Sequence, residues 1–202
     1  MADRAAVYVI DDDAAMRDSL AFLLDVNGFA PKVFETAGAF LSEAADRPAT
    51  CVVVSDIRMP GMNGIELVRK LKNEGLAVPV ILITGHGDVA LAVEAMKAGA
   101  VDFIEKPFDD AVLLSAIRTA LEARPAEGEN TARKEAETRL NELSPRERDV
   151  LQGLVAGKIN KVIAHELNIS PRTVEVYRAN LMAKTGARSM SELMRIALAA
   201  GL

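Results

Sequence analysis

The sequence predicts an α/β domain followed by an all-α domain: a doubly wound five-stranded parallel sheet over residues 1–122, and a four-helix helix-turn-helix domain over residues 143–202. Two observations predict this division. Residues 1–122 alternate strand-like apolar runs with amphipathic segments five times, whereas residues 143–202 contain no strand-like run. A break containing Pro125 and Gly128 separates them, so we expect residues 123–142 to be a linker, whose later part has a helix-forming composition.

The apolar runs of the first part are predicted strands, at residues 7–10, 32–34, 52–55, 78–83 and 102–105. Three consecutive valines in the third run are typical of a strand that is buried on both faces of a parallel sheet. Helical spacing follows each strand and predicts helices from Met16 to Asn27, through Phe40, and over residues 64–73, 88–98 and 110–121. Strict alternation of this kind requires right-handed crossovers within one sheet.

Helix-start signals divide the second part into four helices. Ser144-Pro145 followed by Glu147 predicts a capping box, and Gly157 ends that helix. A second helix is expected over residues 160–167, and Ser170-Pro171 starts a third that runs to about Lys184. Ser191 is the expected cap of the fourth, which runs to about Ala200.

Charge is divided unevenly along the chain, whose net charge is −5. Residues 1–122 carry 11 Lys/Arg against 19 Asp/Glu, and residues 143–202 carry 9 against 5. The second part is therefore expected to meet a polyanion. One cysteine, no secretory signal and no apolar run of membrane-spanning length predict a cytoplasmic protein without a membrane partner.

Polar side chains follow four of the predicted strands: Asp11-Asp12-Asp13, Asp56, Thr84 and Lys106. Parallel strands bring these ends to one edge of the sheet, where carboxylates repel unless a cation lies among them. Asp12, Asp56 and a backbone carbonyl just beyond Asp56 offer hard oxygen ligands to Mg²⁺, and Lys106 and Thr84 suit phosphoryl oxygens. Each residue alone is more often a helix cap or a turn, but jointly they favour phosphoryl transfer onto a carboxylate.

Residues 158–184 have the pattern of a helix-turn-helix, with the second helix as the candidate reader of a DNA groove. The candidate DNA contacts are Lys161, Thr173, Val176, Arg178 and Lys184. Basic side chains would contact phosphates, and Val176 could contact a thymine methyl. Periodicity alone is equally compatible with a charged, solvated face over an ordinary four-helix core.

Four motifs of the first part resemble the receiver domain of two-component response regulators, which has a flavodoxin-like fold. They are Val9-Ile10-Asp11-Asp12, Ser55-Asp56-Ile57-Arg58-Met59-Pro60-Gly61, Ile83-Thr84-Gly85 and Phe103-Ile104-Glu105-Lys106-Pro107-Phe108. The resemblance implies that Asp56 accepts a phosphoryl group from a sensor histidine kinase, without further enzymatic activity. It also implies Mg²⁺ held by Asp11, Asp12, Asp56 and the Arg58 carbonyl, phosphate contacts from Thr84 and Lys106, and Phe103 as the switch aromatic.

Three motifs of the second part resemble LuxR-type DNA-binding domains, at residues 143–151, 157–167 and 169–177. Together the two parts resemble response regulators of the NarL/FixJ family. That resemblance implies a phosphorylation-dependent homodimer that binds double-stranded promoter DNA, works with RNA polymerase and activates transcription. Residues 19–24, 27–29 and 84–89 further resemble regulators of nitrogen-fixation genes. Glu175 departs from the family, since many relatives carry a basic residue there.

Two alternatives come from other functional classes. A ligand-sensing LuxR-type regulator would need an apolar pocket in its first domain, and the acidic strand edge with Lys106 argues against one. A metal-dependent phosphatase with Asp56 as nucleophile would be expected to carry a second acid two residues later, where this chain has Arg58.

Overall fold

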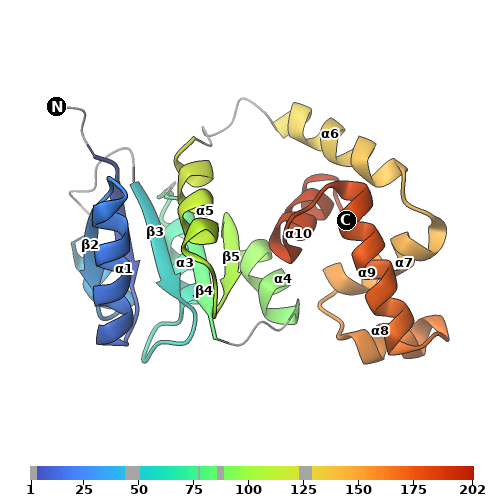
Figure 1. Ribbon diagram of the computed structural model, residues 1–202, viewed down its shortest axis with the longest axis horizontal. Helices are drawn as coiled ribbons and strands as arrows, with labels where there is room; N and C mark the ends of the chain where they lie inside the picture. Colours follow the sequence, from blue (N-terminus) through green and yellow to red (C-terminus); the bar gives the residue numbers. More distant parts are fainter. Residues whose placement is uncertain (1–3, 44–50, 77, 86–88, 123–128) are drawn as a thin grey trace. The chain divides into compact units, whose positions relative to one another are not determined.

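The computed structural model describes residues 4–43, 51–76, 78–85, 89–122 and 129–202 (Figure 1). The chain divides into two compact units, of which the first is built on a sheet and the second is helical in its described part. Both predicted fold classes are confirmed. Of the described helices, none is long and apolar enough to cross a membrane.

The first unit contains one parallel five-stranded sheet. Its strands are β1 (Ala6–Ile10), β2 (Ala30–Phe34), β3 (Cys51–Asp56), β4 (Val80–Thr84) and β5 (Asp102–Glu105), in the order β2-β1-β3-β4-β5. The chain moves in one direction from β1 to β2 and in the other from β3 to β5. The carboxyl ends of β1 and β3 therefore form the topological switch point, where ligands of open α/β sheets bind.

Five helices follow the strands: α1 (Ala14–Val26), α2 (Ala37–Ser42), α3 (Gly64–Asn73), α4 (Val89–Ala98) and α5 (Asp110–Glu122). Leu24 of α1 and Ile117 of α5 pack in one core with alternate residues of the strands, including Val9 and Val54. On β1 the intervening Tyr8 instead contacts the rings of Phe34 and Phe40. Period-two alternation thus supplies a core to each face of the sheet, and all six residues of β3 are buried.

The second unit contains α6 (Glu129–Asn141), α7 (Pro145–Val155), α8 (Asn160–Leu167), α9 (Pro171–Thr185) and α10 (Met190–Ala199). The predicted capping box of α7 is present, with Ser144 as the cap and Glu147 as its reciprocal partner. Helix α6 forms the later part of the predicted linker and packs against α9 and α10, burying Ala136 and Leu140. Residues 123–128 of that linker lie outside the described residues.

Several boundaries differ from the sequence-based expectation, and β1 and β2 begin earlier than predicted, at Ala6 and Ala30. Strand β3 continues to Asp56, and β4 begins at Val80 because Val78 and Pro79 precede the ladder. Helix α10 is capped by Ser189, whose side chain accepts from the Glu192 amide at 3.1 Å. The predicted cap Ser191 is instead buried inside the first turn and hydrogen-bonds to Ser189 at 2.7 Å. Glu192 stands three residues after Ser189, the spacing of a capping box, whereas Met194 stands three residues after Ser191, so the sequence itself favours the earlier serine.

Candidate phosphoacceptor site and DNA-binding interface

The candidate phosphoacceptor site is an ion cluster at the carboxyl edge of the sheet. Asp11 follows β1 and Asp56 ends β3, and these strands are neighbours with Ile10 opposite Ser55. Both carboxylates are buried, with 3% and 8% of the residue exposed. Lys106, which follows β5, places Nζ 2.9 Å from Asp11 Oδ2 and 2.8 Å from Asp56 Oδ1. One ammonium therefore joins three segments that lie far apart in the sequence.

The electrostatics of the cluster are unbalanced. Burial by itself would lower the pKa of Lys106, but hydrogen bonds to Asp56 and Asp11 outweigh it and raise that pKa above its usual 10.5. The lysine is therefore held in its charged form. Two carboxylates share this single positive charge, so the cluster keeps one negative charge in excess.

Backbone groups fix both carboxylates in position. The Arg58 amide donates to Asp56 Oδ2 at 2.6 Å, and the Asp13 amide donates to Asp11 Oδ1 at 2.9 Å. Arg17 adds a bond from α1, since its Nη1 donates to the Asp11 carbonyl oxygen at 2.7 Å. Sequence reasoning missed Arg17, because nothing in the sequence marks this contact.

Gly64 is a second residue that sequence reasoning missed. It begins α3 directly behind Asp56, and a Cβ at this position would lie 2.5 Å from the Asp56 carbonyl oxygen and 2.9 Å from Leu82. Only glycine lets the helix start this close to the strand end. The sequence feature that could have revealed Gly64 is its place as the first helical residue after the Asn63 cap.

Thr84 and Phe103 lie on the two strands nearest Lys106. Thr84 ends β4 with 1% of the residue exposed, and its carbonyl oxygen accepts from the Lys106 amide at 2.7 Å. Phe103 lies within β5, opposite Leu82 of β4, and is half-buried. Their phosphate-binding and switch roles stay predictions.

The oxygen donors at this edge of the sheet carry the negative charge that a divalent cation requires of its ligands. Asp11 and Asp56 supply buried oxygens with an excess negative charge, which a hard cation would offset. Asp12 lies beside them with its side chain exposed, and no three acidic, histidine or cysteine side chains of the described residues form a ready-made metal cluster. The ligand set of Asp11, Asp12, Asp56 and the Arg58 carbonyl therefore stays a prediction, with Asp12 as the member that lies outside the ion cluster.

In the second unit, α8 and α9 form the predicted helix-turn-helix pair. The turn is tight, because Asn168 caps α8 in the left-handed conformation and Ser170 caps α9. Lys161 on α8 and Val176 on α9 are exposed, as DNA contacts must be. The Thr173 hydroxyl lies 2.8 Å from that of Ser170, so it also takes part in the start of α9.

Two further predicted DNA contacts, Arg178 and Lys184, also have partners. Arg178 Nη1 donates to Asn160 Oδ1 at 3.1 Å, which ties the middle of α9 to the first residue of α8. Lys184 Nζ donates to Glu147 Oε2 at 2.8 Å, and the side chain of Glu147 is only 4% exposed. This geometry favours a structural role for Lys184, and its DNA contact stays an untested prediction.

The exposed face of α9 contains further residues that the sequence did not single out. Besides Val176 and Glu175 it presents Arg172 and Asn180 at helical spacing. Arg172 lies in the first turn of α9, the part of a recognition helix that meets base edges. It is therefore a candidate contact alongside those predicted.

Comparison with known families agrees with both halves of this description. Residues 7–118 match the family described as "Response regulator receiver domain", and residues 141–197 match "Bacterial regulatory proteins, luxR family". The chain belongs to the response regulators of the NarL/FixJ family, with a receiver domain and a LuxR-type DNA-binding domain.

Individual relatives extend the similarity over the whole chain. The transcriptional regulatory protein FixJ of Bradyrhizobium diazoefficiens is 53% identical, over 100% of this chain and 98% of its own. The FixJ protein of Rhizobium meliloti is 54% identical over 96% of both, and the response regulator TmoT of Ectopseudomonas mendocina is 42% identical over 95% and 87%. The crystal structure of full-length FixJ from B. japonicum is 54% identical, with a TM-score of 0.58 over 98% and 97% of the two chains.

Proposed function

We propose that the chain is a transcriptional activator that is switched on by phosphorylation of Asp56. A sensor histidine kinase donates the phosphoryl group, and the phosphorylated protein forms a homodimer that binds double-stranded promoter DNA and acts with RNA polymerase. The observation that carries this proposal is the pair of bonds from Lys106 to Asp11 and Asp56. A buried carboxylate beside a fixed ammonium is suited to accepting a phosphoryl group.

The proposed transfer uses groups of this chain at each point. An oxygen of the Asp56 carboxylate attacks phosphorus, a new P–O bond forms, and the bond from phosphorus to the donor's leaving atom breaks. Bound Mg²⁺ supplies positive charge that offsets the charge of the phosphoryl oxygens. Lys106 moves one hydrogen bond from the carboxylate to a phosphoryl oxygen, and the Arg58 amide keeps the carboxylate oriented. Thr84 donates from its hydroxyl, and Phe103 then changes its packing.

The test of the site is phosphorylation by acetyl phosphate with Mg²⁺, read by intact mass. The parent is expected to gain one phosphoryl group, and the Asp56→Asn variant none. Asp13→Asn is the matched control, because Asp13 lies at the same edge but caps α1. Equal labelling of Asp56→Asn and parent would refute the assignment. Continuous release of phosphate at enzymatic rates, without a lasting adduct, would instead favour the phosphatase alternative over a protein with no catalysis beyond its own phosphorylation.

The test of the output is DNA affinity and oligomeric state at one salt concentration, before and after phosphorylation. Phosphorylated protein is expected to become dimeric and to bind a promoter fragment more tightly. Arg178→Ala should weaken binding about equally on all DNA sequences and lower the salt slope by about 1, because a basic side chain on this face is expected to contact a phosphate. Asn160→Ala should weaken DNA binding less than Arg178→Ala does. The double variant should bind DNA no more weakly than Arg178→Ala alone, since Asn160 acts by holding Arg178.

We further propose that the target genes serve nitrogen fixation and that the protein works in the cytoplasm. The whole-length similarity to FixJ proteins supports the first statement. Sequencing of genomic fragments bound by the phosphorylated protein tests it, and enrichment of promoters of other pathways alone would reject it. A DNA-binding output domain supports the second, because its ligand lies in the cytoplasm.

A further inference from the structure

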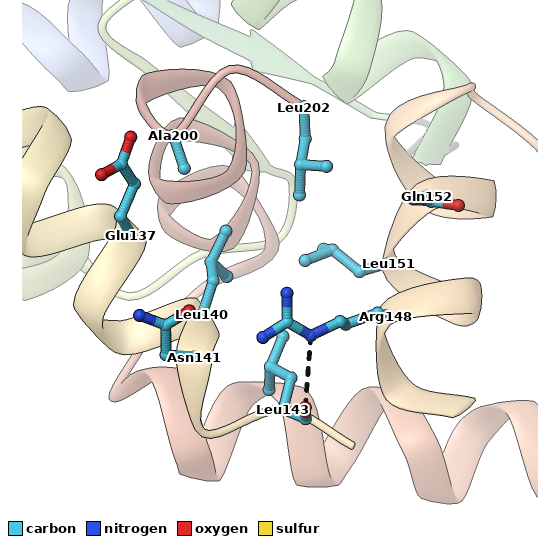
Figure 2. A pocket seen from close by; sticks show the side chains of 9 residues that line it. All are labelled: Glu137, Leu140, Asn141, Leu143, Arg148, Leu151, Gln152, Ala200 and Leu202. Atoms are coloured by element: carbon cyan, nitrogen blue, oxygen red, sulfur yellow. Dashed lines mark hydrogen bonds between the residues drawn. The ribbon is translucent and has the colours of Figure 1, made fainter. Parts of the chain in front are cut away.

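The second unit contains a pocket that neither phosphorylation nor DNA binding uses. It has a volume of about 160 Å³ and lies between α6, the start of α7 and the turn that follows α10 (Figure 2). Four of its nine lining residues are leucines, namely Leu140, Leu143, Leu151 and Leu202. The polar lining residues are Glu137, Asn141, Arg148 and Gln152. Leu140, Leu143 and Leu151 are themselves buried, so the wall is continuous with the core of the unit.

One basic side chain, that of the exposed Arg148, lines the pocket. Arg148 of α7 extends its guanidinium across the pocket towards Leu140, and its Nε donates to the Leu143 carbonyl oxygen at 3.3 Å. That bond fixes the plane of the guanidinium. Among the residues that the structure describes, no other partner of this guanidinium is found, so its terminal N–H groups remain available. Glu137 of α6 also lines the pocket.

We propose that this pocket binds a small carboxylate with an apolar body of about one ring. Leucine-lined cavities of about 150 Å³ accept molecules the size of benzene, so the volume sets the size of that body. A guanidinium held in place by one bond presents its remaining donors in a fork that matches a carboxylate. Apolar contact provides the affinity for the ring, and Arg148 selects an acid over a neutral analogue.

Such a ligand would contact α6 and the helical bundle at once. Of the residues of α6 whose side chains the structure describes, only Ala136 and Leu140 are buried, so the apolar contact of this described part is small. A ligand between Leu140 and Leu151 enlarges that contact and stabilises α6 on the bundle. Helix α6 leads from the receiver unit into the DNA-binding unit, so the ligand would be a second input to the output domain.

Benzoate is the probe that tests this site on the full-length protein, with benzyl alcohol as its neutral counterpart. We expect saturable benzoate binding with a dissociation constant on the order of 1 mM, as for an efficient ligand of this size. Leucine methyl resonances of Leu140 and Leu151 should shift, and amide exchange in α6 should slow. Benzyl alcohol should bind about tenfold more weakly, because it cannot form the paired bonds to Arg148.

The variants separate the site from general effects of charge. Arg148→Gln should weaken benzoate binding about tenfold and leave benzyl alcohol unchanged. Arg146→Gln is the matched control on the same helix, since Arg146 faces Asp149 at 3.7 Å and does not line the pocket. Unchanged methyl resonances at about ten times the expected dissociation constant, or equal benzoate binding by Arg148→Gln and the parent, would overturn the proposal. Binding that leaves α6 exchange unchanged would overturn the coupling to α6.

Discussion

Each unit of the molecule has a lysine that binds a buried carboxylate across a long stretch of sequence, but the two arrangements differ in stoichiometry. In the receiver, Lys106 is shared by Asp11 and Asp56. In the DNA-binding unit, Lys184 is bound to one carboxylate, that of Glu147, and also donates to the Glu142 carbonyl oxygen at 3.5 Å. The Ser144 amide donates to the same Glu147 oxygen at 2.7 Å. The first cluster keeps an excess negative charge and the second is balanced.

The difference in charge balance distinguishes the proposed phosphoacceptor site from an ion pair that only stabilises the fold. A pair of equal and opposite charges does not require a further ion, so Glu147 and Lys184 stabilise the contact between α7 and α9. Two carboxylates with one ammonium repel each other and favour whatever cation or rearrangement relieves that repulsion. If the proposed function holds, Mg²⁺ and the phosphoryl group are what relieves this repulsion in the receiver.

The largest expected effect concerns the glycine behind Asp56. Gly64→Ala should lower the free energy of unfolding of the receiver by about 3 kcal/mol, because the new Cβ meets the Asp56 carbonyl at 2.5 Å and backbone must move. Gly153→Ala in α7 should cost about 1 kcal/mol, since its Cβ meets only the Ile163 side chain, at 2.8 Å, and alanine favours the helix. Urea unfolding of each unit measures both. Equal losses of unfolding free energy in the two variants would show that the end of the sheet at Asp56 is no more rigid than the helical core.

The next effect tests the balanced pair. Glu147→Gln should destabilise the DNA-binding unit by about 2 kcal/mol, because a buried acceptor loses its charge while Lys184 and the Ser144 amide still point at it. Thermal unfolding of the unit measures the change. Glu166→Gln is the control, since its pair with Lys158 is exposed and should contribute less than about 0.5 kcal/mol. Similar losses in the two variants would contradict a structural role for Glu147.

The opposite sign is expected at the unbalanced cluster. Without Mg²⁺, Asp11→Asn should raise the stability of the receiver by about 1 kcal/mol, because Lys106 then neutralises Asp56 alone. Added Mg²⁺ should stabilise the parent more than this variant. Asp13→Asn serves as the control, since Asp and Asn are equivalent helix caps. A loss of stability in Asp11→Asn would reject the idea of excess charge in this cluster.

The smallest effect is a difference in pH dependence between the units. The Lys184 hydrogen bond, and next the Ser144 amide, hold the pKa of Glu147 below its usual 4.5 against the opposing effect of burial. Its contribution is therefore complete above pH 4.5 and is lost as the pH falls below that value. The pKa of Lys106 is raised, so its contribution is complete below pH 10.5 and is lost at higher pH.

The urea concentration at the midpoint of unfolding, measured for each unit at acid and at alkaline pH, tests this contrast. Glu147→Gln should reduce the fall of the urea midpoint of the DNA-binding unit at acid pH. Lys106→Met should reduce the fall of the urea midpoint of the receiver at alkaline pH. If Glu147→Gln leaves the fall at acid pH unchanged, then other carboxylates govern the acid unfolding of the DNA-binding unit.

Much of this protein could be predicted without coordinates. The valine run of β3, the alternation of strands and helices, and the capping box at Ser144 and Glu147 depend on local chemistry, and the structure confirms each of them. The strand-end residues Asp11, Asp56 and Lys106 could be predicted to meet, because parallel strands bring their carboxyl ends to one edge. Local periodicity and sheet topology are properties of the sequence itself.

Tertiary structure alone decided which charged side chains form ion pairs and which side chains line a pocket. Lys184 has the sequence character of a DNA contact, but the fold places it on Glu147, 37 residues away. Arg148 and Leu140 belong to different helices, and only their packing creates the pocket between them. Ion pairs and cavities depend on distances between segments that the backbone brings together, and local sequence patterns do not specify those distances. The sequence therefore determined the edge at which Asp56 lies, and the fold decided that Asp56 shares its lysine with Asp11.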